Sequence, residues 1–380
     1  MPTWTDRDRK HMHLALELAR RGEGRVEPNP MVGCVIVKGG RIVATGYHTR
    51  FGGPHAERVA LQRAGPAARR ATAYITLEPC GHFGKTPPCT DALIRARPRR
   101  VVVAMKDPNP LVAGRGLRAL RAAGIRVDLG LLRSEACDLA APFIKFHRER
   151  RPYVILKWAQ SIDGKIATRT GDSRWITSRR SRAAAHAMRA RVDAVIVGVE
   201  TVLADDPDLT ARLVRPRRQA TRVVLDTRLR TPPRCRLVRS ARSVPTLIVT
   251  GSNQAATARR RLERAGCEVV SVGGGSGGVH LGRLLDLLRA REMTNVLVEG
   301  GGKVLASFLD AGLADEARVF VAPRLIGGAA APGPLRGLGP ARMADRVDVK
   351  LRSRFDCGPD LCYHLRFQHR KRTGRIRPPR

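Results

Sequence analysis

The chain has 380 residues, 43% of them hydrophobic, which is enough for two or three domains that each bury a core. It has no apolar run near the ~18 residues that cross a bilayer, and its N-terminus lacks the apolar segment of a secretory signal, so we expect a cytoplasmic protein without a membrane partner. The formal net charge is +38, but the positive charge is spread along the chain and aromatic residues make up only 4%, so we expect no specific nucleic-acid partner.

Eight cysteines are scattered over the whole length of the sequence. In a reducing compartment such cysteines are usually free thiols, metal ligands or catalytic groups, so a disulfide framework is not expected. Residues 371–380, at the C-terminal end, form a basic tail that is predicted to be solvated rather than folded.

The first part of the chain alternates short apolar runs with helical patterns. VGCVIV (32–37) and IVATGYH (42–48) flank a pair of glycines, which indicates a β-hairpin. The alternation predicts an α/β domain with a sheet of mixed direction over residues 1–150. Its further helices are predicted within 55–65, 87–97 and the first half of 116–130, and its further strands within 71–79, 99–107 and the second half of 116–130.

Residues 132–151 have the pattern of an amphipathic connector, after which a second α/β series extends over residues 151–370. The glycine-rich stretch 273–278 lies inside this series and is predicted to be a loop. Helices are predicted within 178–192 and 302–313, and strands within 152–161, 192–203, 221–227, 246–251, 268–274, 294–302 and 317–328.

PHAE (54–57) and EPCGHFGKTPPC (78–89) carry the residues of a zinc site. His55, Cys80 and Cys89 would supply three ligands and leave the fourth tetrahedral position to a water molecule, whose pKa the metal lowers. Glu57 would move protons between this water and a substrate, as in zinc-dependent nucleobase deaminases. Because residues two apart on a helix point about 200° apart, His55 and Glu57 can meet only at a helix N-terminus.

The spacing of the two cysteines leaves alternatives open. The loop between Cys80 and Cys89 is longer than in the usual C-x-x-C motif of this deaminase class. His82 lies inside that loop and is a competing ligand. The alternative without a metal site is that His55 is a surface histidine and that Cys80 and Cys89 are unrelated core thiols. We prefer Cys89, because two thiolates and one imidazole match the chemistry of the class.

PNPMVGCVIV (28–37), GYHTRFGGPHAE (46–57) and EPCGHFGKTPPC resemble the deaminase half of the bifunctional riboflavin-biosynthesis deaminase/reductase family. The resemblance implies a cytidine-deaminase-like, three-layer α/β/α fold with a mixed sheet. It also implies that Asn29 hydrogen-bonds a pyrimidine, and that His48, His82 and Lys85 help to hold a ribose phosphate. Lys85 suits a phosphate as a point charge, and the prolines on both sides of Asn29 stiffen the loop that presents its amide.

The second half has no G-x-G-x-x-G after an early strand, so a Rossmann dinucleotide site is not predicted. Glycines 300–302 lie between a strand and a helix, where backbone N–H groups can bind phosphate, although such a turn alone is more often structural. LKWAQSIDGKIATRTGDSRWIT (156–177), VLADDP (202–207) and VVLDTRLRTP (223–232) resemble the reductase half of the same family, which has a dihydrofolate-reductase-like α/β fold.

The resemblance implies two sets of contacts in this second half. Cofactor contacts to NADPH are implied for Ala159, Trp175, Thr201, Asp205, Thr227, Gly301, Gly302, Lys303 and Val304. Substrate contacts are implied for Lys157, Ser173, Arg189, Leu209, Arg212 and Glu299, of which the three basic residues suit a sugar phosphate. Without the resemblance, Trp175 would be interpreted as a core residue and Asp205 as a turn residue or helix cap. Asp205 and Glu299 are the two candidates for a proton donor.

Two residues depart from the family pattern. Lys303 stands where a proline or small residue is common and would strengthen the binding of a cofactor phosphate. Glu200 stands where a small residue is common and would be neutral or mildly repulsive to that phosphate. Neither change removes a residue assigned to chemistry.

Together these features predict a homo-oligomeric bifunctional enzyme that uses Zn2+ and NADPH and acts on a small phosphorylated pyrimidine. The first domain would deaminate 2,5-diamino-6-ribosylamino-4(3H)-pyrimidinone 5′-phosphate, and the second would reduce the ribosyl group of the product to ribityl with NADPH. Two alternatives stay open. One is a deaminase whose second domain is a non-catalytic module, and the other is a nucleic-acid deaminase, for which a net charge of +38 would be favourable.

Overall fold

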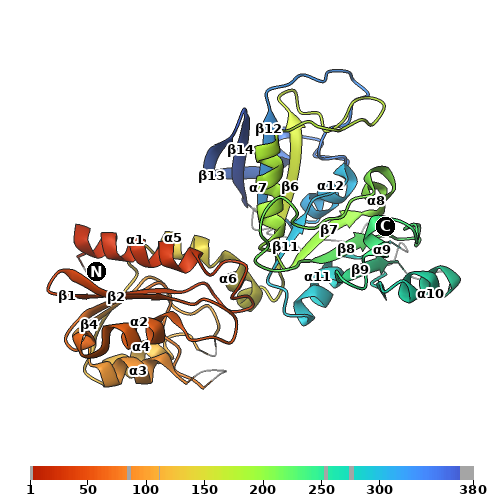
Figure 1. Cartoon of the computed structure of the whole chain (residues 1–380). Helices are drawn as coiled ribbons and strands as arrows, with labels where there is room; N and C mark the ends of the chain where they lie inside the picture. The colour runs from red at the N-terminus through yellow and green to blue at the C-terminus, as the bar shows by residue number, and fades with distance from the viewer. Residues whose placement is uncertain (1–2, 84–86, 111, 252–255, 274–277, 369–380) are drawn as a thin grey trace. The chain divides into compact units, whose positions relative to one another are not determined.

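The computed structural model describes residues 3–83, 87–110, 112–251, 256–273 and 278–368 (Figure 1). The chain forms two compact units, Met1–Pro152 with Leu288–Thr294, and Tyr153–Leu287 with Asn295–Arg380. Lys85, most of the glycine-rich stretch 273–278 and the predicted basic tail 371–380 lie outside the described residues. Over the described ranges no helix combines the length and the apolar character that a membrane span requires.

The first unit contains a five-stranded sheet in the order β2-β1-β3-β4-β5. β1 runs antiparallel to both β2 and β3, whereas β3, β4 and β5 are parallel, so the predicted hairpin and mixed sheet are confirmed. Gly39 and Gly40 make the hairpin turn with positive φ angles, which side chains disfavour. The strands span Gly33–Lys38 (β1), Arg41–Tyr47 (β2), Thr72–Ile75 (β3), Arg100–Val103 (β4) and Arg126–Leu129 (β5).

Helices cover both faces of this sheet and make three layers, as Figure 1 shows. One face holds α1 (Asp6–Arg20), α5 (Arg133–Leu139) and α6 (Ala141–Arg148), and the other holds α2 (Ala56–Ala64), α3 (Cys89–Ala96) and α4 (Arg115–Ala122), with a 3-10 turn at Gly65–Ala68. The alternation of β1 explains the two cores: Val35 packs with α1, and Ile36 packs with α2 and α3. The predicted three-layer α/β/α fold is confirmed.

Helix α1 was not predicted, although its start has a recognisable pattern. The Oγ1 of Thr5 accepts a hydrogen bond from the backbone N–H of Asp8 at 3.1 Å, and the Asp8 carboxylate accepts one from the N–H of Thr5 at 3.1 Å. This reciprocal pair is a capping box, here with aspartate in place of the usual glutamate. The Thr-x-x-Asp spacing before an apolar periodic run would have identified the helix.

The second unit contains a nine-stranded sheet in the order β10-β9-β8-β7-β11-β6-β12-β14-β13. The strands from β10 to β12 are parallel, and β14 and β13 continue the sheet antiparallel at one edge. The seven parallel strands are those predicted, and the α/β class is confirmed. The strands span Tyr153–Ser161 (β6), Ala194–Gly198 (β7), Thr221–Leu225 (β8), Thr246–Thr250 (β9), Glu268–Ser271 (β10), Asn295–Val298 (β11), Glu316–Ala322 (β12), Asp348–Cys357 (β13) and Asp360–Gln368 (β14).

The predicted functional segments of this unit follow the carboxyl ends of its central strands. In the sheet β11 lies between β7 and β6, so the turns after these strands meet at one edge, where open parallel sheets commonly bind ligands. α8 follows β7 directly, and α12 follows β11 through a glycine turn. The helices span Arg179–Arg189 (α7), Val199–Asp205 (α8), Arg236–Arg239 (α9), Ala256–Arg264 (α10), Leu281–Ala290 (α11) and Gly302–Asp310 (α12), with a 3-10 turn at Met343–Asp345.

Candidate active sites

Three potential metal ligands of the first unit meet at the N-termini of two helices. His55 is the N-cap of α2, Cys89 is the first residue of α3, and Cys80 lies between β3 and α3. The Nδ1 of His55 lies 3.5 Å from the Sγ of Cys80 and 3.3 Å from the Sγ of Cys89. One imidazole nitrogen and two sulfurs this close together fit a catalytic zinc ion. The competing ligand His82 is exposed and lies outside this cluster.

Glu57 is buried in the first turn of α2, beside the three ligands. Its Oε2 atom has no hydrogen-bond partner among the described residues. Burial and the nearby negative charge of Cys80 raise the pKa of Glu57 to about 7. A carboxyl group with such a pKa can both take up and release a proton near neutral pH. The helix N-terminus is therefore where His55 and Glu57 meet, as their spacing required.

His48 forms hydrogen bonds within the protein through both of its ring nitrogens, one of them with Asn29. The Nδ1 of His48 lies 3.0 Å from the carbonyl oxygen of Pro54, and its Nε2 lies 3.2 Å from the Nδ2 of Asn29. Because a carbonyl only accepts, Nδ1 carries the proton and Nε2 accepts a hydrogen bond from the Asn29 amide. Burial lowers the pKa of His48, which favours this neutral form. Both ring nitrogens are thus engaged within the protein, and among the described residues no group donates a hydrogen bond to the Oδ1 of Asn29.

A cavity of about 350 Å³ lies beside the ligand cluster. The structure brings six predicted residues to its lining: Asn29, His48, His55, Glu57, Cys80 and His82. Sequence reasoning missed Asp107, Asn109 and Val112, which line the same cavity from the segment after β4. The Oδ1 of Asp107 accepts a hydrogen bond from the N–H of Asn109 at 2.8 Å. An Asp-Pro-Asn-Pro run shortly after a parallel strand was the pattern that could have identified this turn.

A buried ion-pair cluster forms the floor of the second unit's candidate site. Arg189 of α7 donates to both carboxylate oxygens of Glu299, at 2.6 and 2.8 Å, and the Nζ of Lys157 lies 3.6 Å from Glu299. Burial alone would raise the pKa of Glu299, but Arg189 and Lys157 outweigh it and lower that pKa to about 2. Glu299 therefore stays ionised and is unsuited to donate a proton. Burial lowers the pKa of Lys157.

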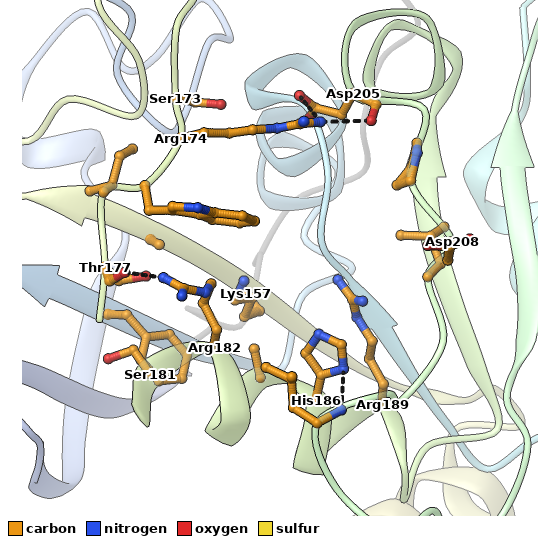
Figure 2. Close-up of a pocket in the computed structure, with 18 of the residues that line it drawn as sticks. Lys157, Ser173, Arg174, Thr177, Ser181, Arg182, His186, Arg189, Asp205 and Asp208 are labelled. Atoms are coloured by element: carbon orange, nitrogen blue, oxygen red, sulfur yellow. Dashed lines mark hydrogen bonds and ion pairs between the residues drawn. The ribbon is translucent and has the colours of Figure 1, made fainter. Parts of the chain in front are cut away.

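A cavity of about 630 Å³ is lined by the two basic members of this cluster, Lys157 and Arg189, whereas Glu299 lies behind them and is not among the lining residues. Figure 2 shows Arg174 and Asp205 at one side of it, and His186 and Arg189 at the other. Trp175 is 60% exposed, so the interpretation as a core residue is wrong, and the guanidinium of Arg182 lies 4.3 Å from its ring centroid. Eight predicted residues line the cavity: Lys157, Ala159, Ser173, Trp175, Arg189, Asp205, Leu209 and Arg212.

The glycine turn between β11 and α12 packs so closely against its neighbours that a side chain on Gly300 would not fit. A Cβ on Gly300 would lie 2.9 Å from the Oγ1 of Thr201, and Gly301 has a positive φ of 67°. Gly302 begins α12, whose N-terminus has no side-chain cap. Free N–H groups at a helix N-terminus fit a cofactor phosphate. Lys303 and Val304 continue this first turn, whereas Thr227 follows β8 and its carbonyl accepts from Thr250.

Glu200, one of the two departures from the family pattern, is paired within the protein. Its Oε1 accepts a hydrogen bond of 2.5 Å from Arg230, and this bond, together with the charges of Arg230 and Lys303, lowers the pKa of Glu200. The negative charge that would repel a phosphate is thus balanced by Arg230. The positive charge of Lys303 therefore dominates beside the glycine turn.

Sequence reasoning also missed His186, which lines the second cavity from α7. Its Nδ1 accepts a hydrogen bond from the backbone N–H of Arg212 at 2.8 Å, drawn in Figure 2, so the ring ties α7 to the segment that carries Arg212. Burial and the charges of Arg189 and Arg212 lower the pKa of His186 to about 4, which keeps the ring neutral at physiological pH. Its position three residues before Arg189, on the same face of a helix, was the available indication.

Comparison with known families agrees with both sites. Residues 5–105 match the family model of the cytidine and deoxycytidylate deaminase zinc-binding region, and residues 152–363 match that of the RibD C-terminal domain. The riboflavin biosynthesis protein RibD of Aquifex aeolicus is 44% identical over 354 residues, which cover 93% of this chain and 97% of the relative. RibD of Escherichia coli is 43% identical over 367 residues, covering 94% of this chain and 99% of the relative.

Two solved structures share the whole architecture. RibD of Acinetobacter baumannii superposes with a TM-score of 0.83 at 36% identity, and the match covers 96% of this chain and 99% of that chain. A diaminohydroxyphosphoribosylaminopyrimidine deaminase/5-amino-6-(5-phosphoribosylamino)uracil reductase from Thermotoga maritima superposes with a TM-score of 0.82 at 36% identity, covering 95% and 99%. With relatives this similar over nearly its full length, the chain belongs to the RibD family of bifunctional deaminase/reductase enzymes of riboflavin biosynthesis.

Proposed function

We propose that the first unit deaminates 2,5-diamino-6-ribosylamino-4(3H)-pyrimidinone 5′-phosphate with zinc, and that the second unit then reduces the ribosyl group of the product with NADPH. The observation that carries the proposal is the His55, Cys80 and Cys89 cluster beside a buried Glu57, at the wall of a cavity lined by Asn29. The family relationship supplies the pathway, and this geometry supports the first reaction in this chain.

In the deaminase site the residues of the chain would bind the pyrimidine and move protons. Zinc, held by His55, Cys80 and Cys89, would supply the activation of a water molecule at near-neutral pH. Glu57 would take a first proton from that water and give it to the ring nitrogen, and would then move the second proton of the same water oxygen to the leaving amine, which departs as ammonia. Since the Nδ2 of Asn29 is bound to His48, its Oδ1 is suited to accept a hydrogen bond from an amino group of the substrate.

In the reductase site the chain would place the substrate against the nicotinamide. NADPH would supply the hydride, and the glycine turn with Thr201, Lys303 and Val304 would hold part of the cofactor. Lys157 lines the cavity as an ammonium of lowered pKa, which suits it to give a proton to the sugar oxygen during ring opening. Arg212 would attract the phosphate of the substrate.

Self-association and a cytoplasmic location belong to the same proposal. β13 is the outermost strand of its sheet and carries three exposed apolar side chains, Val349, Leu351 and Phe355. A second copy of the chain that covers this edge would remove both its unpaired backbone groups and its apolar exposure. All eight cysteines are free, which is typical of proteins in a reducing compartment.

Mass spectrometry of the products tests the proposal. The purified, zinc-loaded protein is given the diamino substrate with NADPH, and we expect successive mass changes for loss of the amino group and for reduction. Glu57→Gln should abolish deamination while the same chain still reduces the deaminated intermediate when that is supplied. Lys157→Met should abolish reduction while deamination continues. Deamination without NADPH oxidation would contradict the second half of the proposal, and no conversion by folded protein would contradict the substrate.

A further inference from the structure

Glu78 is a buried carboxylate that none of the steps above uses. It follows β3, two residues before Cys80, and is 3% exposed. Four backbone N–H groups donate to its side chain. Oε2 accepts from Gly114 at 2.8 Å and Asp107 at 3.1 Å, and Oε1 accepts from Gly116 at 3.0 Å and Leu117 at 3.3 Å. A buried carboxylate with this many amide donors has its charge compensated by the backbone alone.

The Glu78 carboxylate supplies the hydrogen-bond acceptor that the N-terminus of helix α4 lacks. The N-cap of α4 is Gly114, which has no side chain to accept from the free N–H groups of the first turn. Glu78 accepts from two of these groups, Gly116 and Leu117, and its negative charge lies at the positive end of the helix. Gly116 allows this approach, because a Cβ there would lie 2.0 Å from the carbonyl oxygen of Pro79.

Glu78 also holds the turn that sequence reasoning missed. Its own N–H donates to the carbonyl of Met105 at 3.0 Å, while its side chain accepts from the N–H of Asp107. Asp107 in turn accepts from Asn109, and both residues line the deaminase cavity. One residue adjacent to the metal-ligand segment therefore anchors both ends of the segment between β4 and α4, which contributes Asp107, Asn109 and Val112 to the cavity wall.

We propose that Glu78 is a positioning residue of the deaminase: its carboxylate fixes the substrate-facing wall that contains Asp107 and Asn109, without acting on the metal ligands. This inference rests on the proposed deaminase function. Glutamine at position 78 can accept at only one of its two side-chain atoms, so its NH2 group would face two N–H donors. One pair of anchoring bonds would then be lost, and the wall would no longer be held at both ends.

The test compares Glu78→Gln with the wild type and with Glu17→Gln, which removes the same charge from an exposed position on α1. We expect Glu78→Gln to raise the KM for the diamino substrate at least about tenfold, equivalent to ~1.4 kcal/mol, with a smaller change in kcat and an unchanged zinc content. Reduction of the deaminated intermediate by the same chain should be unaffected, which shows that the second unit is intact, and a melting temperature of the first unit close to that of the wild type controls for the folding of the mutated unit. Hydrogen exchange should show faster exchange of the amides of Asp107, Gly114, Gly116 and Leu117.

Other outcomes overturn the inference. An unchanged KM with lost amide protection would make Glu78 a purely structural residue, and loss of zinc would place its action on the ligands. If Glu78→Gln does not fold, Glu78→Asp keeps the charge but shortens the side chain, and failure of both variants to fold would again leave only a structural role. A wild type that does not turn over the substrate would refute the proposed function. Hydrogen exchange would still test whether the Glu78 carboxylate holds the four amides, because this measurement does not depend on activity. If the four amides stay protected in Glu78→Gln, the carboxylate does not anchor them.

Discussion

Arg189 and Glu299 face each other as a two-point ion pair, with Nε and Nη2 of the arginine donating to the two carboxylate oxygens. The Glu299 side chain is only 4% exposed, and Lys157 approaches it as a second cation. The pair joins α7 to the end of β11, directly before the glycine turn. Because its charges are buried, removing one partner leaves the other without compensation.

Glu299→Gln should therefore damage both the stability and the reductase. We expect the free energy of unfolding of the second unit to fall by about 3 kcal/mol, and NADPH-dependent reduction to be lost. Deamination by the same chain should persist, because Glu299 belongs to the other unit. Denaturant titration and separate assays of the two activities check this. The matched control is Glu200→Gln, which breaks the exposed pair with Arg230 and should leave stability unchanged.

The stability of the second unit should depend on the protonation of His186. Its pKa is about 4 in the folded protein and near 6.5 in the unfolded chain, so the unfolded chain takes up the proton first. The free energy of unfolding should fall, by roughly 2 kcal/mol, as the pH is lowered from 6.5 to 4. His186→Gln keeps an acceptor for the N–H of Arg212 but does not titrate. The difference between the two proteins, measured by denaturant titration, should follow this pH range, and a difference that is constant with pH would contradict the assignment.

His48→Phe tests the orientation of Asn29. The ring shape is kept, but the acceptor for the Nδ2 of Asn29 is lost, so the amide can turn away from the substrate. We expect the KM for deamination to rise about tenfold, the loss of one well-placed hydrogen bond, with the zinc content unchanged. If His48 contacted the phosphate directly, a substrate analogue without phosphate would be insensitive to the change. Steady-state kinetics with both compounds separates the two cases.

Removal of zinc should abolish deamination and leave reduction unchanged. Chelation is expected to abolish deamination, because Glu57 alone does not lower the pKa of a water molecule as a metal ion does, and to lower the melting temperature of the first unit. Reduction of the deaminated intermediate by NADPH should continue at its original rate. Activity assays before and after zinc is added back check this. Deamination that survives complete metal removal would contradict the role of His55, Cys80 and Cys89.

The sequence was sufficient for the elements that carry strong patterns. The parallel strands of both units, the glycine hairpin turn and the convergence of His55 with Cys80 and Cys89 follow from periodicity, turn residues and ligand spacing. The hairpin of β13 and β14 was missed, although Gly358 and Pro359 mark its turn. Its strands are half exposed, with arginines between the apolar residues, so the alternation is weak.

What the sequence could not give are contacts between distant segments. The partner of His48 is decided by the fold, since His48 and Asn29 lie on separate loops that pack together. The four amide donors of Glu78 come from residues that are about thirty to forty positions away. Trp175 is exposed because its side chain stacks on Arg182 over a cavity, which hydrophobicity alone does not predict. Such roles depend on three-dimensional proximity rather than on residue type.

The position of β11 in the nine-stranded sheet has a consequence for biosynthesis on the ribosome. β6 and β7 follow each other in the chain but do not pair, because β11, made much later, separates them. The five strands of the first unit, in contrast, have all emerged before β6 is made. A nascent chain can therefore complete the deaminase sheet early, whereas β6 and β7 lack the strand that joins them until residue 298 is available. Translational pauses between these points would expose an unfinished reductase, and it is there that a chaperone would be needed most.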